Sequence, residues 1–142
     1  MKSIIIYTDG ACSGNPGPAG AGVFLSFGDY KKYIYQYLGE ATNNIAELKA
    51  IEIAVDSLKT GKYPVTIHTD SSYSLGVLSK NWKTKKNKEL ISTIKVKLQK
   101  YPKLQIKKVT GHAGVEGNEI ADELARLAVE TKTSHTTTTS PL

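Results

Sequence analysis

The sequence predicts an α/β fold with one mixed five-stranded sheet flanked by helices. Three apolar segments come first, at residues 3–8, 22–27 and 32–38, with no helical pattern between them. Strands that follow one another without a crossover helix pair as antiparallel neighbours. After residue 43, helical and strand-like segments alternate, which favours parallel crossovers. We therefore expect strands 1–3 to be antiparallel, strands 1, 4 and 5 to be parallel, and strand 1 to lie at the centre.

The first half of the chain contains the three antiparallel strands and one helix. Residues 3–8 are apolar and β-branched, which is typical of a buried strand. Residues 10–22 are rich in Gly, Pro, Ala, Asn and Ser, which predicts tight turns. Residues 28–31 join the next two strands as a hairpin. From Asn44 onward, apolar residues recur at spacings of three and four, which predicts an amphipathic helix that ends before Gly61.

The second half of the chain alternates strands and helices and then changes composition. The expected order is a strand at 65–69, a short helix at 71–78, a helix containing Leu90, Ile94 and Leu98, a strand at 104–109 and a helix at 118–129. The last segment is rich in Thr and Ser and has no apolar periodicity. We therefore predict one domain over residues 1–130 and a disordered tail over residues 131–142.

The composition excludes several classes of protein. The 39% share of hydrophobic residues fits a globular domain. The net charge of +6 favours a polyanionic partner, although it also simply increases solubility. Cys12 is the only cysteine, so no internal disulfide can form, which is compatible with a reducing compartment. No segment approaches the ~20 apolar residues of a membrane span. We expect a cytoplasmic monomer with no membrane partner.

Four acids stand in four separate motifs: Asp9, Glu47, Asp70 and Asp122. Asp9 and Asp70 follow predicted parallel strands, and such neighbours place their carboxylates roughly 5 Å apart. Ligands bind outside the carboxyl ends of strands in open α/β sheets. Converging carboxylates are the oxygen ligands that Mg²⁺ requires. Two ions about 3.5–4 Å apart would satisfy four carboxylates and hold a phosphate between them.

Each acid also has a local explanation that needs no metal ion. Acids are common in turns, at helix N-termini and in ion pairs along helices. The local roles are a turn for Asp9, a capping box of Glu47 with Asn44, an N-cap for Asp70 and an ion pair of Asp122 with Arg126.

His112 is a candidate for proton transfer. It lies in a glycine-flanked loop ten residues before Asp122. A histidine has a reference pKa near 6.5, which suits proton transfer at neutral pH. The alternative is an exposed loop histidine without a role. His68 lies within a strand pattern, and we interpret it as structural.

Four segments, in order, together resemble type 1 ribonuclease H over about residues 3–129. They are TDGACSGNPGPAG at 8–20, TNNIAEL at 42–48, TDSSY at 69–73, and GHAG with NEIADELA within 111–125. The stretch between Tyr73 and Leu90 is short, so the chain resembles the short bacterial or archaeal form that lacks a basic handle. The lysines of this stretch would supply a reduced version of that handle.

This resemblance implies a ribonuclease H-like fold and an endonuclease that hydrolyses the RNA strand of RNA–DNA hybrids. The products would carry 5′-phosphate and 3′-hydroxyl ends, and two Mg²⁺ ions would act per site, with Mn²⁺ as a substitute. The four acids fall on the family's metal-ligand positions. His112 falls on the position of a histidine that assists proton transfer or product release, and Glu119 matches an auxiliary acid.

The resemblance also implies how a hybrid would be recognised. RNA is distinguished from DNA by its 2′-hydroxyl. The implied contacts to the RNA strand are Gly10, Ser13, Asn15, Asn44 and Ser72, and those to the DNA strand are Thr42, Asn43, Asn87 and Trp82. Ser72 replaces a longer amide, and Glu40 stands near a position that is often basic. We therefore expect weaker affinity for the substrate and a strong salt dependence.

Two other functions remain open on the sequence alone. One is another nuclease or strand-transfer enzyme of the ribonuclease H-like fold; such enzymes share the carboxylates but generally lack the Gly-rich segment and the Asn43-Asn44 pair. A non-catalytic hybrid-binding module is the other alternative. It is disfavoured because no acid position is replaced. Trp82 likewise has a structural alternative, as a packing residue at a helix end.

Overall fold

The computed structural model describes residues 2–109 and 116–139. Within them the chain forms a mixed six-stranded sheet in the order β5-β4-β1-β2-β3-β6. The strands are β1 (Ile4–Cys12), β2 (Gly17–Phe27), β3 (Tyr30–Ala41), β4 (Val65–Thr69), β5 (Leu104–Lys108) and β6 (His135–Thr139). β1 pairs antiparallel with β2 and parallel with β4, and β5 is parallel to β4. The predicted strand directions and the inner position of strand 1 are thus confirmed.

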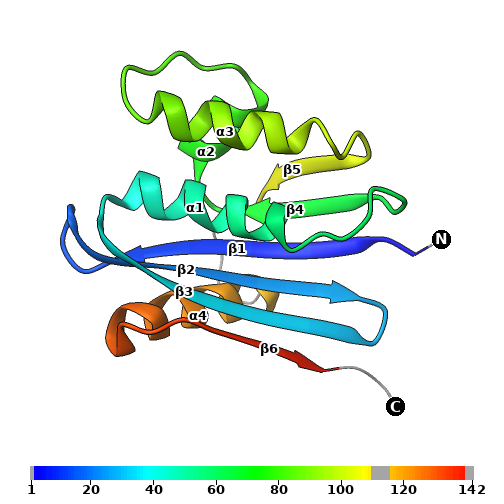
Figure 1. Cartoon of the computed structure of the whole chain (residues 1–142), viewed down its shortest axis with the longest axis horizontal. Helices are drawn as coiled ribbons and strands as arrows, with labels where there is room; N and C mark the ends of the chain where they lie inside the picture. The colour runs from blue at the N-terminus through cyan, green and yellow to red at the C-terminus, as the bar shows by residue number, and fades with distance from the viewer. Residues whose placement is uncertain (1, 110–115, 140–142) are drawn as a thin grey trace.

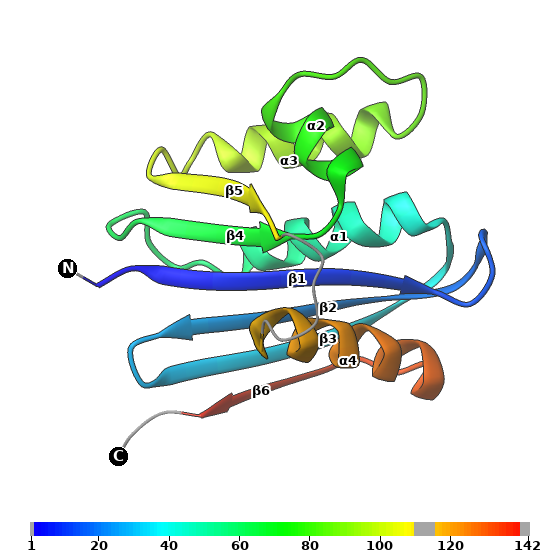
Figure 2. The ribbon, with the colours of Figure 1, turned by 180° about the vertical axis from the view of Figure 1, so that it is seen from behind.

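Helices cover both faces of the sheet (Figures 1 and 2). They are α1 (Asn43–Asp56), α2 (Ser72–Ser79), α3 (Lys88–Leu98) and α4 (Glu116–Thr131). Helix α1 crosses one face over β1, and α4 lies on the opposite face, as the two views show from front and back. The two helices thus lie on opposite sides of β1 and β2, and side chains from both can reach the same strand. None of these helices, within the described residues, has the length and apolar character needed to cross a membrane.

The main hydrophobic core lies between the α1 face of the sheet and the helices that cover it. Its central members are fully buried: Ile6, Leu48, Ile51, Ile67 and Ile94. They come from β1, α1, β4 and α3, so elements distant in sequence share one core. Burying each large aliphatic side chain stabilises the fold by about 1.5–3 kcal/mol.

The other face of the sheet is packed at backbone distance against α4. A Cβ atom on Gly22 of β2 would lie 2.1 Å from the carbonyl oxygen of Ala121, and one on Gly20 would lie 2.6 Å from that of Ala125. At the start of α4, a Cβ atom on Gly117 would lie 2.2 Å from the ring of Tyr7. These glycines therefore allow α4 to pack directly against the backbone of the sheet.

The Gly-rich segment differs from its predicted conformation. We predicted tight turns over residues 10–22, but β1 continues to Cys12 and β2 begins at Gly17, so the turn is confined to residues 13–16. The chain does turn at residues 13–16, where Gly14 has a φ of 90°, but the prediction was wrong for the rest of the segment, where glycines allow the close approach of a helix. Gly10 shows this too, since a Cβ atom there would lie 2.6 Å from the backbone of Ala46 in α1.

The sheet has six strands rather than the predicted five. The sixth strand, β6, falls in the tail that we predicted to be disordered, so that prediction is wrong for residues 135–139. β6 pairs antiparallel with β3 from Lys31 to Tyr35, and the Tyr37 N–H donates a hydrogen bond of 2.9 Å to Ser134 Oγ. All five β6 residues are exposed. Backbone pairing holds the strand, together with a contact between the rings of Tyr35 and His135, whose centroids lie 6.1 Å apart. The sequence of the strand has no hydrophobic pattern from which it could have been predicted. The domain boundary at residue 130 stays a prediction.

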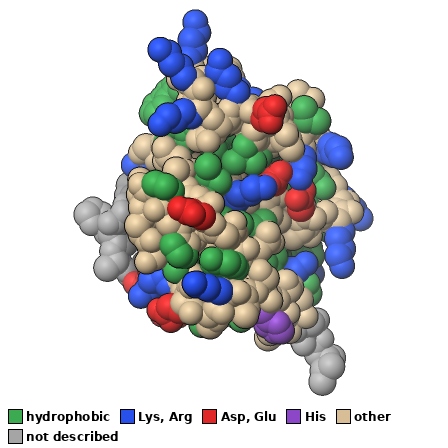
Figure 3. Space-filling view, turned by 60° about the vertical axis from the view of Figure 1, so that its left-hand side comes forward, with side chains coloured by type: hydrophobic (Ala, Val, Ile, Leu, Met, Phe, Trp, Pro, Cys, Tyr) green, Lys and Arg blue, Asp and Glu red, His purple; other side chains and the backbone are tan. Residues whose placement is uncertain are grey.

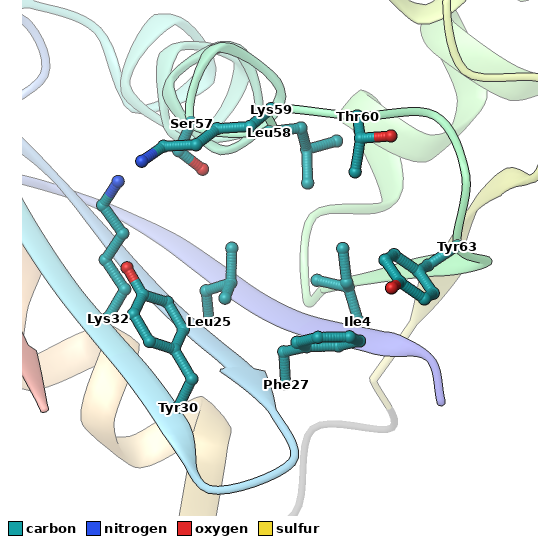
Figure 4. Close-up of a pocket in the computed structure, with 10 residues that line it drawn as sticks. All are labelled: Ile4, Leu25, Phe27, Tyr30, Lys32, Ser57, Leu58, Lys59, Thr60 and Tyr63. Carbon is teal, nitrogen blue, oxygen red and sulfur yellow. The ribbon is translucent and has the colours of Figure 1, made fainter. Parts of the chain in front are cut away.

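An apolar hollow lies near Ile4, at the start of β1, and Figure 4 shows the residues that line it. It has a volume of about 300 Å³ and lies between the β2–β3 hairpin and the segment that follows α1. Its lining includes Ile4, Leu25, Phe27, Leu58 and Tyr63. None of the four acids lines this hollow, so it is not the site where they would bind metal ions. Asp9 lies toward the opposite end of β1.

We expect Gly22→Ala to destabilise the protein by about 1–3 kcal/mol, because the added methyl group would overlap the backbone of α4. Urea denaturation followed by circular dichroism would measure the free energy of unfolding. Gly61→Ala is the matched control, since its Cβ atom would meet its nearest neighbour, the Lys100 carbonyl oxygen, at 3.4 Å. Equal stability of Gly22→Ala and the wild-type protein would contradict the tight packing of α4.

Candidate active site

Asp9 and Asp70 are brought together by the parallel pairing of β1 and β4. The register aligns Tyr7 with His68, and each acid lies two residues further along its chain. Asp9 lies within β1, only 6% exposed, and pairs with Gly22 of β2. It is not in a turn, so the local explanation for Asp9 is wrong. Asp70 follows the end of β4 and is exposed.

Glu47 reaches the same place from α1. Gly10 of β1 donates its N–H to Asp9 Oδ1 at 3.0 Å and to Glu47 Oε1 at 3.1 Å. The N-cap of α1 is Thr42, whose Oγ1 accepts the Ile45 N–H at 3.2 Å. The proposed capping box of Glu47 with Asn44 is therefore wrong. One backbone N–H instead orients two carboxylates that stand 38 positions apart in sequence.

The three carboxylates form one compact cluster. Asp9, Glu47 and Asp70 each offer an oxygen atom, and these oxygens all lie within 4.8 Å of one another. Burial, followed by the negative charge of Asp70, raises the pKa of Asp9 to about 7. Burial, followed by the charge of Asp9, raises the pKa of Glu47 to about 10. Burial also raises the pKa of Asp70. Carboxylates this close repel one another unless they bind protons or a cation.

The donor set of this cluster fits a divalent cation such as Mg²⁺ or Mn²⁺. Hard cations take carboxylate oxygens, and several carboxylates that point into one site are their usual protein ligands. Binding such a cation removes the repulsion that raises the pKa values of Asp9 and Glu47. The cluster can therefore hold metal ions against which a phosphate could bind.

Asp122 joins the cluster at its edge, from α4. Its carboxyl group interacts with that of Asp9, and this interaction further raises the pKa of Asp9. Its other partner is Arg126, whose Nη2 atom lies 3.0 Å from Asp122 Oδ2. The ion pair that is the local explanation for Asp122 is thus formed, and Asp122 lies next to Asp9 as well. The two interpretations of this acid are compatible.

Asp70 is not used as a helix cap. The N-cap of α2 is Ser71, whose Oγ accepts the Ser74 N–H at 3.0 Å. The local explanation for Asp70 is therefore wrong, and its carboxylate is left for the cluster. Sequence reasoning overlooked Lys108, whose positive charge acts to lower the pKa of Asp70. Lys108 ends β5, the parallel neighbour of β4, so the strand order was the signal that could have found it.

Residues expected to contact one or the other strand of a hybrid surround the start of α1. Asn15 Oδ1 accepts the Asn43 N–H at 2.9 Å, which ties the β1–β2 turn to this helix. Ser13, Asn15, Asn43 and Asn44 are exposed, and Thr42 is partly buried as the cap. A helix N-terminus favours negatively charged groups. This surface is therefore suited to the phosphates or sugar hydroxyls of a nucleic acid strand.

A second surface lies between α2 and α3. Trp82 is 50% exposed, and its ring packs on Gly76, where a Cβ atom would lie 2.1 Å from Trp82 Cε3. Asn87 donates a hydrogen bond of 3.1 Å to the Tyr73 hydroxyl group. Ser72 is exposed at the start of α2. Trp82 thus packs at the end of α2, as its structural alternative predicted, and half of it is exposed. Its contact with a hybrid stays a prediction.

Lysines gather on the segment that joins α2 and α3, at the top of the molecule in Figure 3. They are Lys80, Lys83, Lys85, Lys86 and Lys88, and all are exposed. Such a group attracts the phosphates of a nucleic acid independently of sequence. The acid cluster is therefore accompanied by a basic surface on the same chain.

A model of the RNase H family matches residues 1–130. The chain belongs to the ribonuclease H family. Among its relatives, the ribonuclease H of Syntrophomonas wolfei is 36% identical over 92% of this chain and 98% of the relative. The ribonuclease HI of Haemophilus ducreyi is 39% identical over 94% of each chain.

Solved structures agree with the membership in the ribonuclease H family. The crystal structure of LC11-RNase H1 in complex with an RNA/DNA hybrid matches 92% of this chain and 99% of its own, with 30% identity and a TM-score of 0.76. The RNase H1 of the halophilic archaeon Halobacterium salinarum matches with 29% identity and a TM-score of 0.72. That match covers 91% of this chain and 98% of the archaeal one.

Two predicted members of the site need separate mention. His112 lies outside the described residues, so its role stays a prediction. Glu119 is exposed on α4, three residues before Asp122. Its role as an auxiliary acid also stays a prediction.

We expect the metal-free ribonuclease H to lose stability as the pH rises, with Glu47 as a main cause. Its pKa is raised from 4.5 to about 10 on folding, so between these values the folded state binds more protons than the unfolded state. Stability must then fall with rising pH. Glu47→Gln removes this contribution and flattens the dependence by at most about 1.4 kcal/mol per pH unit.

Urea denaturation in EDTA at several pH values between 5 and 8 would measure both slopes. Glu40→Gln, which changes an exposed glutamate of β3, is the control and should keep the wild-type slope. Saturating Mg²⁺ should flatten the slope of the wild-type protein more than that of Glu47→Gln, whose remaining slope comes from Asp9 and Asp70. If the wild-type protein and Glu47→Gln had the same slope in EDTA, this would contradict the crowding of the carboxylates.

Proposed function

We propose that the protein hydrolyses the RNA strand of RNA–DNA hybrids with two divalent metal ions held by Asp9, Glu47, Asp70 and Asp122. Membership in the ribonuclease H family makes it an enzyme that acts on nucleic acid. The observation that carries the proposal is the convergence of Asp9, Glu47 and Asp70 on one small volume, with Asp122 beside Asp9. Mg²⁺ is the expected ion, with Mn²⁺ as a substitute. The products would carry 5′-phosphate and 3′-hydroxyl ends.

The residues of the site would act by holding and orienting charge. When bound, the metal ions supply a water of lowered pKa and neutralise charge on the leaving oxygen. Asp9 interacts with each of the other three acids, so it would hold the metal ions together with them. The Gly10 N–H holds Asp9 and Glu47 in fixed orientations, so little reorganisation is needed. His112 is expected to assist proton transfer or product release.

Recognition of the hybrid would use the two surfaces on either side of the acids. The RNA strand would lie along the β1–β2 turn, the start of α1 and the start of α2. There Gly10, Ser13, Asn15, Asn44 and Ser72 would read the 2′-hydroxyl groups. The DNA strand would reach from the start of α1 to the second surface, with Thr42, Asn43, Asn87 and Trp82 as contacts. The relative solved with a bound RNA/DNA hybrid supports this substrate. The cytoplasmic location and the monomeric state stay predictions.

We expect Asp9→Asn to retain the fold and to lower the rate of hybrid cleavage to less than about one thousandth of the wild-type rate. Metal ions supply several kcal/mol of transition-state stabilisation, and each 1.36 kcal/mol is worth a factor of ten. The rate is measured in Mg²⁺ on a hybrid labelled in its RNA strand. Asp29→Asn, in the exposed β2–β3 hairpin, is the control and should keep full activity.

The same assay distinguishes this proposal from related activities. An all-DNA duplex, a single strand and a four-way DNA junction are offered beside the hybrid. Preferential cutting of the junction would instead favour another nuclease of this fold. Binding of the hybrid without turnover in either Mg²⁺ or Mn²⁺ would favour a non-catalytic binding module. Full activity of Asp9→Asn would overturn the assignment of the site.

We expect the lysines between α2 and α3 to contribute to hybrid affinity through phosphates. Changing Lys85 and Lys86 together to Gln should raise KM and reduce the slope of log affinity against log salt by as much as about 1.8, since each phosphate contact contributes about 0.9. The matched control changes Lys59 and Lys100, which are exposed at the opposite end of β4. An unchanged salt slope in the first variant would show that this surface does not contact the hybrid.

A further inference from the structure

Arg126 stands out among the basic residues of the chain. It is the only arginine among 19 lysines and arginines. It lies on α4 four residues after Asp122, and its Nη2 atom is 3.0 Å from Asp122 Oδ2. A guanidinium group has a planar, fork-shaped set of donors that matches a carboxylate, whereas lysine offers a flexible point charge. The one residue of this kind therefore contacts an acid of the site.

Arg126 has other acids within reach and does not pair with them. Glu123 lies three residues before it and Glu130 four residues after it, and both spacings place side chains on one helix face. Among the described residues, the ion pair of Arg126 is formed with Asp122. Of Asp122, Glu123 and Glu130, Arg126 therefore pairs with the acid that also lies beside Asp9.

Asp122 is the acid of the site that most needs such a partner. Its side chain is 45% exposed, whereas Asp9 is buried. The backbone of α4 is held by its contacts with Gly20 and Gly22, but these contacts do not restrict the side-chain torsions of Asp122. Its other close neighbour, Asp9, carries a like charge when ionised and repels it. Within residues 2–109 and 116–139, Arg126 is the cation that opposes this repulsion.

We propose that Arg126 is a positioning residue for metal binding. It holds one oxygen of Asp122, so that the carboxylate stays beside Asp9 and leaves its other oxygen for a metal ion. Groups that hydrogen-bond to metal ligands orient them in this way, and their loss typically costs about 10–100-fold in metal affinity or activity. This inference rests on the proposed function, because it takes Asp122 to be a metal ligand.

The sign of the effect separates positioning from simple electrostatics. If Arg126 only contributed positive charge near the site, its removal would reduce repulsion and tighten the binding of a divalent cation. If Arg126 positions Asp122, its removal weakens that binding. If Arg126 formed only a structural ion pair on the helix surface, its removal would neither tighten nor weaken cation binding. It would also leave stability almost unchanged, since exposed pairs contribute little to stability.

The experiment titrates Mn²⁺ calorimetrically into the full chain, alone and bound to a hybrid with a non-hydrolysable scissile linkage. The Mg²⁺ concentration for half-maximal cleavage is measured beside it. We expect Arg126→Gln to weaken metal binding about tenfold and to raise the Mg²⁺ requirement accordingly, with a nearly unchanged melting temperature. Arg126→Lys, which keeps the charge and the reach, should recover much of the loss. Lys132→Gln removes a charge just beyond α4 and should bind metal like the wild-type protein.

Arg126→Gln that binds metal as tightly as the wild-type protein, or more tightly, would overturn the proposal. The proposal would also be overturned if Arg126→Gln weakened metal binding as much in the Asp122→Asn protein as in the wild-type protein. A positioning residue has no effect once its target is changed. Either result with an active, metal-binding wild-type protein leaves the proposed function intact. A wild-type protein that neither binds Mn²⁺ nor cleaves the hybrid would overturn both.

Discussion

Backbone contact between the sheet and two helices is the constraint on which the rest of the site depends. Gly10 lets α1 approach β1, and this approach places Glu47 beside Asp9. Gly22 lets α4 approach β2, and this approach places Asp122 on the other side of the same strand. Side chains at these two positions would push both helices outward. The acids would then lie too far apart to share a metal ion.

This arrangement places several carboxylates close together in a partly buried site, where water screens their charges poorly. Burial and mutual repulsion raise the pKa values of Asp9 and Glu47, so the metal-free site is a source of instability. The fold tolerates it because the main core on the α1 face is separate and fully apolar. Arg126 and Lys108 offset part of the charge at the edges of the cluster. A site that is unfavourable without its ions is well suited to bind them.

The secondary structure was predictable where a periodic apolar pattern marks it. The five predicted strands and four helices occur in the expected order, because burial on one face leaves a repeating signal in the sequence. The ends of β1 and β2 were missed because glycine signals both turning and close packing. The strand at His135–Thr139 was missed because it is held by backbone pairing with β3, which leaves no side-chain pattern.

The sequence by itself determined the family and the identities of the acids, because these depend on short motifs at fixed spacing. It also determined the strand order around β1, since helices between strands require parallel crossovers. Only the tertiary structure decided whether Asp9, Glu47 and Asp70 take local roles or join the cluster. Glu47 accepts the Gly10 N–H rather than capping its own helix, and Ser71 caps α2 in place of Asp70. These choices depend on contacts between residues far apart in the chain, and a local pattern does not encode the geometry of such contacts.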